Sequence, residues 1–179
     1  MLFRSGFKFA PLASPDGYLT VQLRSYFPTG DSRNGLGTNH YSIEPALLFT
    51  RKVAPAVVLS GQFSVWHPID GSSALPISAG KSFAGDVLTY GAGVSRRFQV
   101  SENLRVAPVI EIVGWNIRSG YVTLATGPVS ASGENIVNAK LGARLFVGAK
   151  NSIYAGFGRQ LSNVGWNRDF LRVEYARTF

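Results

Sequence analysis

Cysteine is missing from this chain of 179 residues, and charged residues are scarce. The only histidines are His40 and His67, which stand far apart in the sequence, so without cysteine no set of metal ligands is expected. The absence of cysteine does not by itself decide the compartment. Charged residues make up 16% of the chain, against roughly 25% in an average soluble domain. This composition leaves enough apolar residues for a large core or a lipid-facing surface.

Long hydrophobic runs are also missing. No segment approaches the ~20 consecutive apolar residues of a spanning helix, so the chain can cross a membrane only as a closed barrel. No apolar segment of the kind found in secretory signal peptides follows Met1. The net charge is +8, but the basic residues are scattered, with 51–52 and 96–97 as the only adjacent pairs. Nucleic acid is therefore not expected as a partner.

The chain does contain a recurrent two-residue alternation of apolar and polar side chains, which is typical of strands. It is clearest from Val137 to Val147, where apolar residues alternate with Asn138, Lys140 and Arg144. The predicted strands are residues 18–27, 40–51, 56–66, 86–98, 104–116, 135–147, 152–161 and 169–179. About eight strands result, each close to the roughly ten residues of a tilted membrane strand.

The connections between these strands alternate strictly in length. Short connections are predicted at 52–55, 99–103 and 148–151, and long ones at 28–39, 67–85, 117–134 and 162–168. Outer-membrane barrels alternate short periplasmic turns with longer external loops in the same way. The sequence therefore predicts one all-β domain over residues 1–179, an antiparallel up-and-down transmembrane β-barrel in the bacterial outer membrane.

The C-terminal segment supports the same compartment. Leu171, Val173, Tyr175 and Phe179 share one face of an extended strand, and the chain stops on the phenyl ring. A terminal aromatic that closes an alternating strand resembles the C-terminal signal of outer-membrane barrels. The expected partners are therefore outer-membrane lipid and the barrel-assembly machinery. Arg177, on the same face, departs from this signal, but it can extend its charge to the membrane boundary.

The N-terminal segment does not fit a complete barrel. Residues 2–9 resemble the end of a further strand, followed by a short turn at 10–17. A ninth strand conflicts with the even strand number of single-chain bacterial barrels. We therefore expect an N-terminally truncated product that lacks its signal peptide and at least one strand. In the alternative, residues 2–9 are a disordered remnant and eight strands close alone.

Three short segments resemble a known family. They are Y-F-P-T-G-D at 26–31, G-L-G-T at 35–38 and E-P-A-L-L at 44–48. Together they resemble the outer-membrane, transporter-like family named for the MetA pathway of phenol degradation. The residues that carry the resemblance are Pro28, Thr29, Gly30, Asp31, Gly35, Gly37, Glu44 and Pro45. The resemblance implies a larger barrel, of about 10–14 strands, of which this chain is the C-terminal part. It also implies that the barrel passes small apolar or aromatic compounds.

Charged residues on the polar faces of the predicted strands are assigned to the lumen. They are Arg24, Glu44, Arg97, Arg105, Glu111, Lys140, Arg144, Arg172 and Glu174. Such charges can line an aqueous path with a preference for anions, as in a channel or transporter of small solutes. They can also pair across strands and fill a non-transporting, structural barrel. A soluble, ligand-binding barrel of lipocalin type would instead reverse the faces and place Leu141, Leu145 and Val173 inside.

No enzymatic activity and no cofactor are expected. His40, Ser42 and Glu44 share a face at two-residue spacing and offer a base, a hydroxyl and a carboxylate. Neighbours on one face of a strand are roughly 6.5 to 7 Å apart, which exceeds hydrogen-bond reach for most rotamers. These three residues are therefore not predicted to form a catalytic set.

Overall fold

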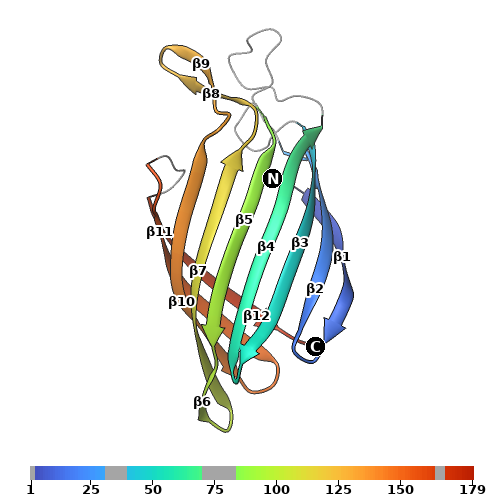
Figure 1. Cartoon of the computed structure of the whole chain (residues 1–179), viewed down its shortest axis with the longest axis vertical. Coiled ribbons are helices and arrows are strands. Elements are labelled where there is room, and N and C mark those ends of the chain that lie inside the picture. The colour runs from blue at the N-terminus through green and yellow to red at the C-terminus, as the bar shows by residue number, and fades with distance from the viewer. Residues whose placement is uncertain (1–2, 31–39, 70–83, 164–167) are drawn as a thin grey trace.

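The computed structural model describes residues 3–30, 40–69, 84–163 and 168–179 (Figure 1). In these ranges the elements are strands, and no helix occurs that is long and apolar enough to cross a membrane. The strands are β1 (Phe3–Ser14), β2 (Gly17–Phe27), β3 (Tyr41–Ala54), β4 (Val57–Ile69), β5 (Val87–Arg96), β6 (Phe98–Ser101), β7 (Leu104–Ile117), β8 (Tyr121–Leu124), β9 (Gly127–Ser130), β10 (Asn135–Val147), β11 (Asn151–Gln160) and β12 (Asp169–Arg177).

Ten of these strands form one antiparallel sheet. Its path is β1-β2-β3-β4-β5-β7-β10-β11-β12, with β6 paired to β7. This order confirms the predicted up-and-down arrangement, but the path contains nine strands rather than about eight. The additional strand is β1, which pairs with β2 from Phe3 and Phe27 down to Ser14 and Gly17. The alternative that the N-terminal residues are a disordered remnant is therefore wrong for residues 3–9. The turn expected at 10–17 is also shorter than predicted: it comprises only residues 15–16, because β1 continues to Ser14 and β2 begins at Gly17.

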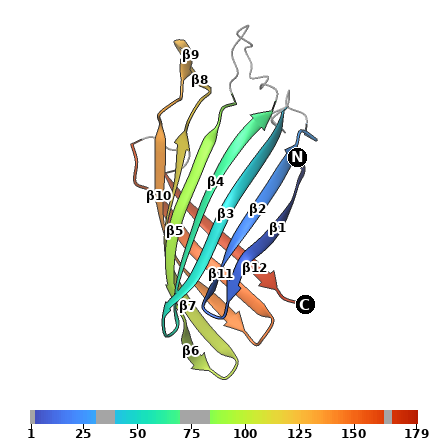
Figure 2. The ribbon, with the colours of Figure 1, turned by 45° about the vertical axis from the view of Figure 1, so that its right-hand side comes forward.

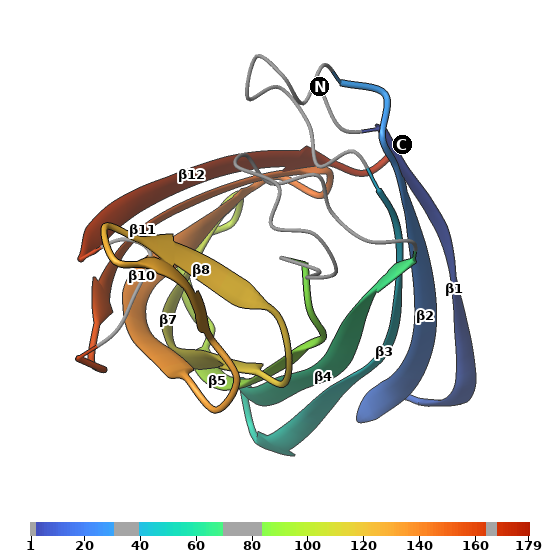
Figure 3. The same cartoon turned by 90° about the horizontal axis from the view of Figure 1, so that it is seen from above.

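The sheet bends strongly about its long axis, but it is not closed into a barrel (Figures 2 and 3). Among the described residues no backbone pairing joins β1 to β12. The number of strands in the path explains why β1 and β12 do not pair as antiparallel neighbours. Eight successive antiparallel pairings lead from β1 to β12, so these two strands run in the same direction. An antiparallel ladder cannot form between them directly.

The two ends of the sheet differ in their connections. Short turns follow β1, β3, β6 and β10 at one end, which we call the hairpin end (Figure 1). The opposite end, the loop end, carries the small β8–β9 sheet. Of the predicted long connections, 28–39, 67–85 and 162–168 lie partly outside the described residues. The connection predicted at 117–134 is not a plain loop, because β-branched Val122 and Val129 pair across β8 and β9.

Proline explains a break within the sheet. Pairing of β5 with β7 ends at Ser95 and Val109, and β6 resumes at Phe98 opposite Val106. Pro108 lies opposite this gap and has no N–H to donate to a neighbouring strand. On its other side the chain stays attached to the β4 hairpin, because the backbone N–H of Arg97 donates to the carbonyl of Ala56 at 2.9 Å. The predicted strand 86–98 is therefore divided into β5 and β6.

The two faces of the bent sheet carry different side chains. Large apolar residues lie on the convex, outer face, where their exposed fractions range from 37% to 81%. In register, they form a continuous band over all nine strands of the path, which we call the apolar belt. Its members are Phe7, Phe9, Val21, Leu47, Phe49, Leu59, Phe63, Val94, Ile110, Ile112, Leu141, Leu145, Ile153, Phe157, Leu171 and Val173.

Aromatic and charged residues flank the apolar belt. At the loop end, Phe27 lies between Phe3 and Tyr41, with ring centroids 5.6 and 6.0 Å from theirs. Tyr175 and Phe98 are exposed near the hairpin end. Outward charged residues of the described strands stand near the two ends and not within the belt. They are Arg51, Arg96 and Arg177 toward the hairpin end, and Arg159 and Asp169 toward the loop end.

Candidate functional site

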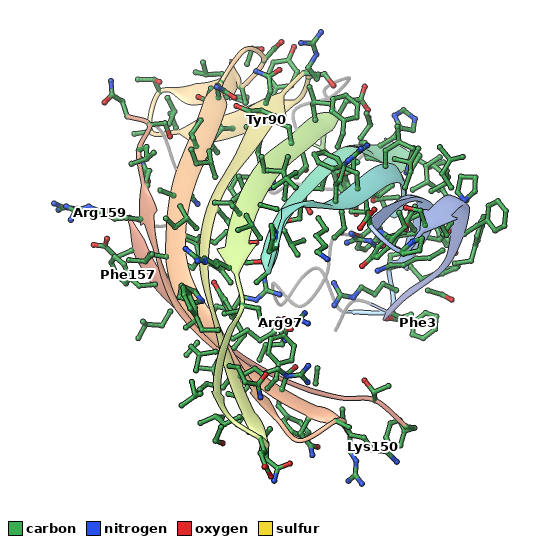
Figure 4. All side chains as sticks on the ribbon, turned by 60° about the horizontal axis from the view of Figure 1, so that its bottom comes forward. Phe3, Tyr90, Arg97, Lys150, Phe157 and Arg159 are labelled. Carbon is green, nitrogen blue, oxygen red and sulfur yellow. The ribbon has the colours of Figure 1, made fainter. Side chains whose placement is uncertain are left out.

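The concave, inner face is the candidate functional site. Its side chains line several cavities, three of which follow one another along the middle of the sheet. The loop-end cavity, lined by Tyr26, Trp66 and Trp115 among others, measures about 500 Å³. The central cavity measures about 620 Å³ and the hairpin-end cavity, which includes Lys52 and Phe146, about 390 Å³. Figure 4 shows Arg97 within the curve of the sheet, whereas Phe157 and Arg159 point away from it.

Glu44 organises the wall of the loop-end cavity. This carboxylate is 8% exposed and accepts a hydrogen bond from Ser64 Oγ at 2.8 Å and another from the Tyr26 hydroxyl. Nη1 of Arg24 lies 3.4 Å from Glu44 Oε2. The four residues come from β2, β3 and β4, which are adjacent in the sheet. A buried carboxylate is costly unless it is paired and hydrogen-bonded, and these partners satisfy it.

The rest of the loop-end cavity includes two tryptophans. Trp66 of β4 and Trp115 of β7 both line it, and the ring of buried His40 packs edge-on against Trp66 at 5.5 Å. His40, Ser42 and Glu44 all lie on the inner face, as their spacing predicts. Glu44 is, however, bonded to Tyr26 and Ser64, and His40 packs on a tryptophan. These contacts give Glu44 and His40 structural partners, whereas the buried Ser42 hydroxyl has no hydrogen-bond partner among the described residues.

The central cavity spans the width of the curved sheet. Lys8 of β1 and Arg172 of β12, the two edge strands, both line it. Between them, Lys140 Nζ of β10 lies 3.1 Å from Glu111 Oε2 of β7, its direct neighbour in register. Gln62 lines both this cavity and the loop-end cavity, so the two adjoin. The polar lining is therefore continuous from the loop end past the middle of the sheet.

Nearer the hairpin end, one carboxylate joins two guanidinium groups. Glu174 accepts hydrogen bonds from Arg144 and from Arg172, each at 2.6 Å, through different oxygens. Arg144 also donates to Ser152 Oγ at 3.1 Å. The ring of Tyr154 lies beneath both cations, 5.4 Å from Arg144 and 6.0 Å from Arg172. Two arginines, one carboxylate and one aromatic ring thus link β10, β11 and β12.

Tyr154 fits the inner face because two glycines give it room. It is only 5% exposed and lies against Gly142 and Gly156. A Cβ at Gly142 would lie 2.6 Å from the tyrosine oxygen and 2.7 Å from the backbone oxygen of Ala155. An aromatic side chain that covers neighbouring glycines compensates for the packing that glycine lacks in a strand. The glycines are therefore required by the position of this ring.

Arg97 and Arg105 lie at the hairpin end, where both contact one ring. Their guanidinium carbons are 5.0 and 5.5 Å from the centroid of Phe146. Arg105 also donates to the carbonyl of Gly148 at 3.4 Å. No carboxylate lies within ion-pair distance of either arginine in the described part of the chain. The nine residues assigned to the lumen thus form three charge-paired clusters and this unpaired stack.

The segments that carry the family resemblance have structural contacts. Thr29 Oγ1 accepts a hydrogen bond from the Phe3 N–H at 3.1 Å and so connects the segment after β2 to β1. Pro45 faces outward, and the pairing of β3 with β4 lapses at 44–45, where proline offers no donor. Pro28 and Gly30 follow β2. Asp31, Gly35 and Gly37 lie outside the described residues.

The residues of the C-terminal signal form one edge of the sheet. Leu171, Val173 and Tyr175 are exposed on the outer side of β12. Phe179 follows the end of that strand, with the Arg177 guanidinium 5.7 Å from its ring. The N–H of Thr178 donates to the carbonyl of Lys150, which holds this end against the β10–β11 turn.

Sequence reasoning did not select Tyr26, Ser64, Phe146 or Tyr154 as functional residues. Each lies at an inward position that alternation alone could have indicated. Their partners, however, come from other strands, and the pairing of strands is not visible in one segment. Within the described residues no group of three metal-ligating side chains occurs. No protein-family model matches the chain, and no curated protein matches it.

Proposed function

We propose that this protein is an outer-membrane β-barrel of the channel or transporter type that passes small solutes. The apolar belt is the observation that carries the proposal. It crosses all nine strands of the path without an outward charge, whereas the inner face holds the charged clusters. This is the distribution that a lipid-facing surface and an aqueous interior require.

The extent of the belt supports a membrane rather than water as its surroundings. If each of its side chains exposes on the order of 80 Å², the belt exceeds the ~300–600 Å² of the largest apolar patch on a typical soluble monomer. On β12, outward charges stand at Asp169 and Arg177, eight residues apart (177 − 169). At ~3.3 Å per residue this is roughly 26 Å along the strand. A tilt of about 40° reduces it to roughly 20 Å, close to the ~25 Å height of a barrel's apolar band.

The alternative of a lipocalin-type soluble barrel is disfavoured by the same faces. Such a barrel needs Leu141, Leu145 and Val173 inside, and all three are exposed on the convex side of the sheet. The concave side presents Glu44, Lys140 and other polar groups instead. The connections agree with the membrane proposal, since turns of two or three residues gather at one end.

The proposal requires the sheet to close, because an open edge in hydrocarbon leaves backbone N–H and C=O groups unpaired. The free edges, β1 and β12, run parallel to each other. Closure therefore takes one of two forms: a direct parallel pairing of β1 with β12, or an odd number of further strands between them. The second form gives the even strand number of single-chain bacterial barrels and agrees with the prediction of a larger barrel.

A non-transporting, structural barrel is the second candidate, and the pairing of the inner charges favours it. Glu44 and Glu111 each hold a cation of a neighbouring strand, and Glu174 holds Arg144, which lies two strands away. Such pairs link strands whether or not solute passes. The three cavities, each of several hundred Å³, support passage instead. For the solute, the family resemblance suggests small apolar or aromatic compounds, and the tryptophans of the loop-end cavity suit such a ligand.

Cell fractionation tests the membrane assignment. The chain, expressed behind a secretory signal peptide, is expected in the outer-membrane fraction, with gel mobility that shifts on heating because folded barrels resist detergent. A truncated variant that ends at residue 168 and lacks β12 serves as the control and is expected to lose the heat shift. Recovery of the full chain in the soluble periplasmic fraction, without a heat shift, would contradict the proposal.

Planar-bilayer recording then separates the two candidates. A channel gives discrete conductance steps after the purified protein inserts. Protein that inserts and shifts its mobility on heating, but passes no current in any of several salts and transports no small aromatic solute into vesicles, identifies the structural barrel.

A further inference from the structure

The hairpin-end cavity has an unusual charge composition. Its volume is about 390 Å³, and its lining includes the cations Lys52, Arg97 and Arg144 without any carboxylate. Apolar walls come from Phe146 and Val109 among others. These residues belong to adjoining strands in the middle of the sheet, from β3 to β10, and not to the edges. The cavity therefore does not depend on how the sheet closes.

The carboxylates of the inner face pair with only one of these three cations, Arg144. Glu44 pairs with Arg24, and Glu111 pairs with Lys140. Glu174 is shared between Arg144 and Arg172. In the part of the chain that the structure describes, neither Lys52 nor Arg97 has an acidic side chain within ion-pair distance. The cavity thus carries excess positive charge, which a bound anion would compensate.

Arg97 is held in a position suited to anion recognition. Its guanidinium stacks over Phe146 at 5.0 Å, while Arg105 lies 5.5 Å from the same ring. A guanidinium stacked on a ring keeps the N–H groups of its edge available, and its fork matches the geometry of a carboxylate. Two cations on one ring also repel each other, and an anion between the basic groups relieves this repulsion.

We propose that the hairpin-end cavity binds small organic carboxylates. Arg97 and Lys52 hold the carboxylate, and Phe146 with the apolar wall holds a short hydrocarbon body. The volume lies within the roughly 300–1,000 Å³ of small-molecule sites, and mixed apolar and basic walls suit an amphiphilic anion better than a bare ion. This site extends beyond the proposed transport function, because binding here requires neither passage of solute nor a membrane.

Equilibrium binding to the full chain, folded in detergent micelles, tests the proposal. Sodium butyrate is titrated by calorimetry at constant ionic strength, with sodium chloride as the blank. Saturable binding is expected, with a Kd near 1 mM as the order of magnitude for one such site. Acetate is expected to bind several-fold more weakly than butyrate, because it lacks the hydrocarbon body. Tighter binding of inorganic phosphate than of butyrate would overturn the carboxylate assignment.

Variants locate the binding site. Arg97→Gln is expected to weaken butyrate binding at least ~10-fold, since a charge-assisted bidentate contact is lost. Arg97→Lys, which keeps the charge but not the fork, is expected to lose less. Lys150→Gln is the matched control: this lysine is exposed in the β10–β11 turn at the same end of the sheet and does not line the cavity (Figure 4).

The controls keep the result interpretable. Heat-shifted gel mobility identifies the variants that fold, and Lys52→Gln replaces Arg97→Gln if the latter does not. Equal butyrate affinity in the wild type and in a folded cavity variant, or no saturable binding at all, would overturn the proposal. Because the assay needs no current, a silent bilayer would count against transport and not against this site.

Discussion

The two faces of the sheet differ sharply within a single strand, the thirteen-residue β10. Its outward residues, such as Leu141 and Leu145, are large, apolar and exposed. Its inward residues include Lys140 and Arg144, and each has a specific partner on a neighbouring strand or two strands away. The outward side chains of β10 are thus exposed, whereas its inward charged side chains form ion pairs. The two faces are expected to respond in opposite ways to the same kind of substitution.

Packing explains this difference. An outward side chain of the belt meets only its cross-strand neighbours, so its burial depends on what surrounds the molecule. An inward side chain meets partners brought together by curvature, as Tyr154 meets Gly142 and Gly156. The stability effect of a substitution on the outer face therefore depends on whether water or lipid surrounds the molecule. On the inner face it depends on the curvature of the sheet.

The largest expected effect is that of a charge in the apolar belt. Leu141 is central in β10 and 63% exposed. In a bilayer, Leu141→Arg is expected to lower the free energy of unfolding by about 2–4 kcal/mol, because an arginine at the midplane must leave water. Denaturant titration of the protein folded into phosphatidylcholine vesicles measures this change.

Leu141→Ala is the matched control and is expected to cost much less than the arginine. In water, a substitution at a residue this exposed stays within about 0.5 kcal/mol. An arginine variant as stable as the wild type in vesicles would therefore remove the basis for treating the outer face as lipid-facing.

The next effect concerns the inner face and depends on shape rather than charge. A Cβ at Gly156 would lie 2.8 Å from Cζ of Tyr154, so Gly156→Ala forces the buried ring to move. The expected loss of unfolding free energy is about 1–3 kcal/mol, as for other overpacked sites. Denaturant titration of the single and double variants forms a cycle with Tyr154→Ala. In the Tyr154→Ala background the added methyl is expected to be nearly neutral; an undiminished cost would show that the ring is not the obstacle.

The smallest effect is expected from the arginine cluster. Glu174→Gln weakens the bonds to Arg144 and Arg172, and the three side chains are 26% to 54% exposed. Because water screens such pairs, the loss in unfolding free energy is about 1 kcal/mol or less. The difference from wild type should shrink in 1 M salt, where the screening length falls to ~3 Å. Glu102→Gln, in the turn after β6, is the control, and an equal loss there would point to net charge rather than to the cluster.

Most of the strand pattern could be predicted because alternation is local. Residues 135–147 and 104–116 were predicted as strands and correspond to β10 and to most of β7. The break between β5 and β6 was missed, since it requires Pro108 of another strand opposite the gap. The β8–β9 sheet was missed because short pairs in a long connection resemble loop sequence.

The candidate site was less accessible to sequence reasoning. Alternation placed Arg144 and Glu174 on polar faces, but their contact joins two strands separated by β11. Only the curvature of the sheet brings them within 2.6 Å. The stack of Arg97 and Arg105 on Phe146 likewise needs the pairing of β7 with β10, which places Phe146 opposite Arg105.

The sequence by itself determined the strands, their order and the two chemically different faces. These properties follow from the two-residue period of an extended chain and from turn residues, which act over short distances. Tertiary structure decided which face is concave, which charges pair and that the sheet remains open. These depend on register, on glycines that admit Tyr154, and on the parity of nine strands, which leaves β1 and β12 parallel. The concave face, the charge pairs and the open edge all arise from contacts between segments that are distant in the sequence, so no single segment predicts them.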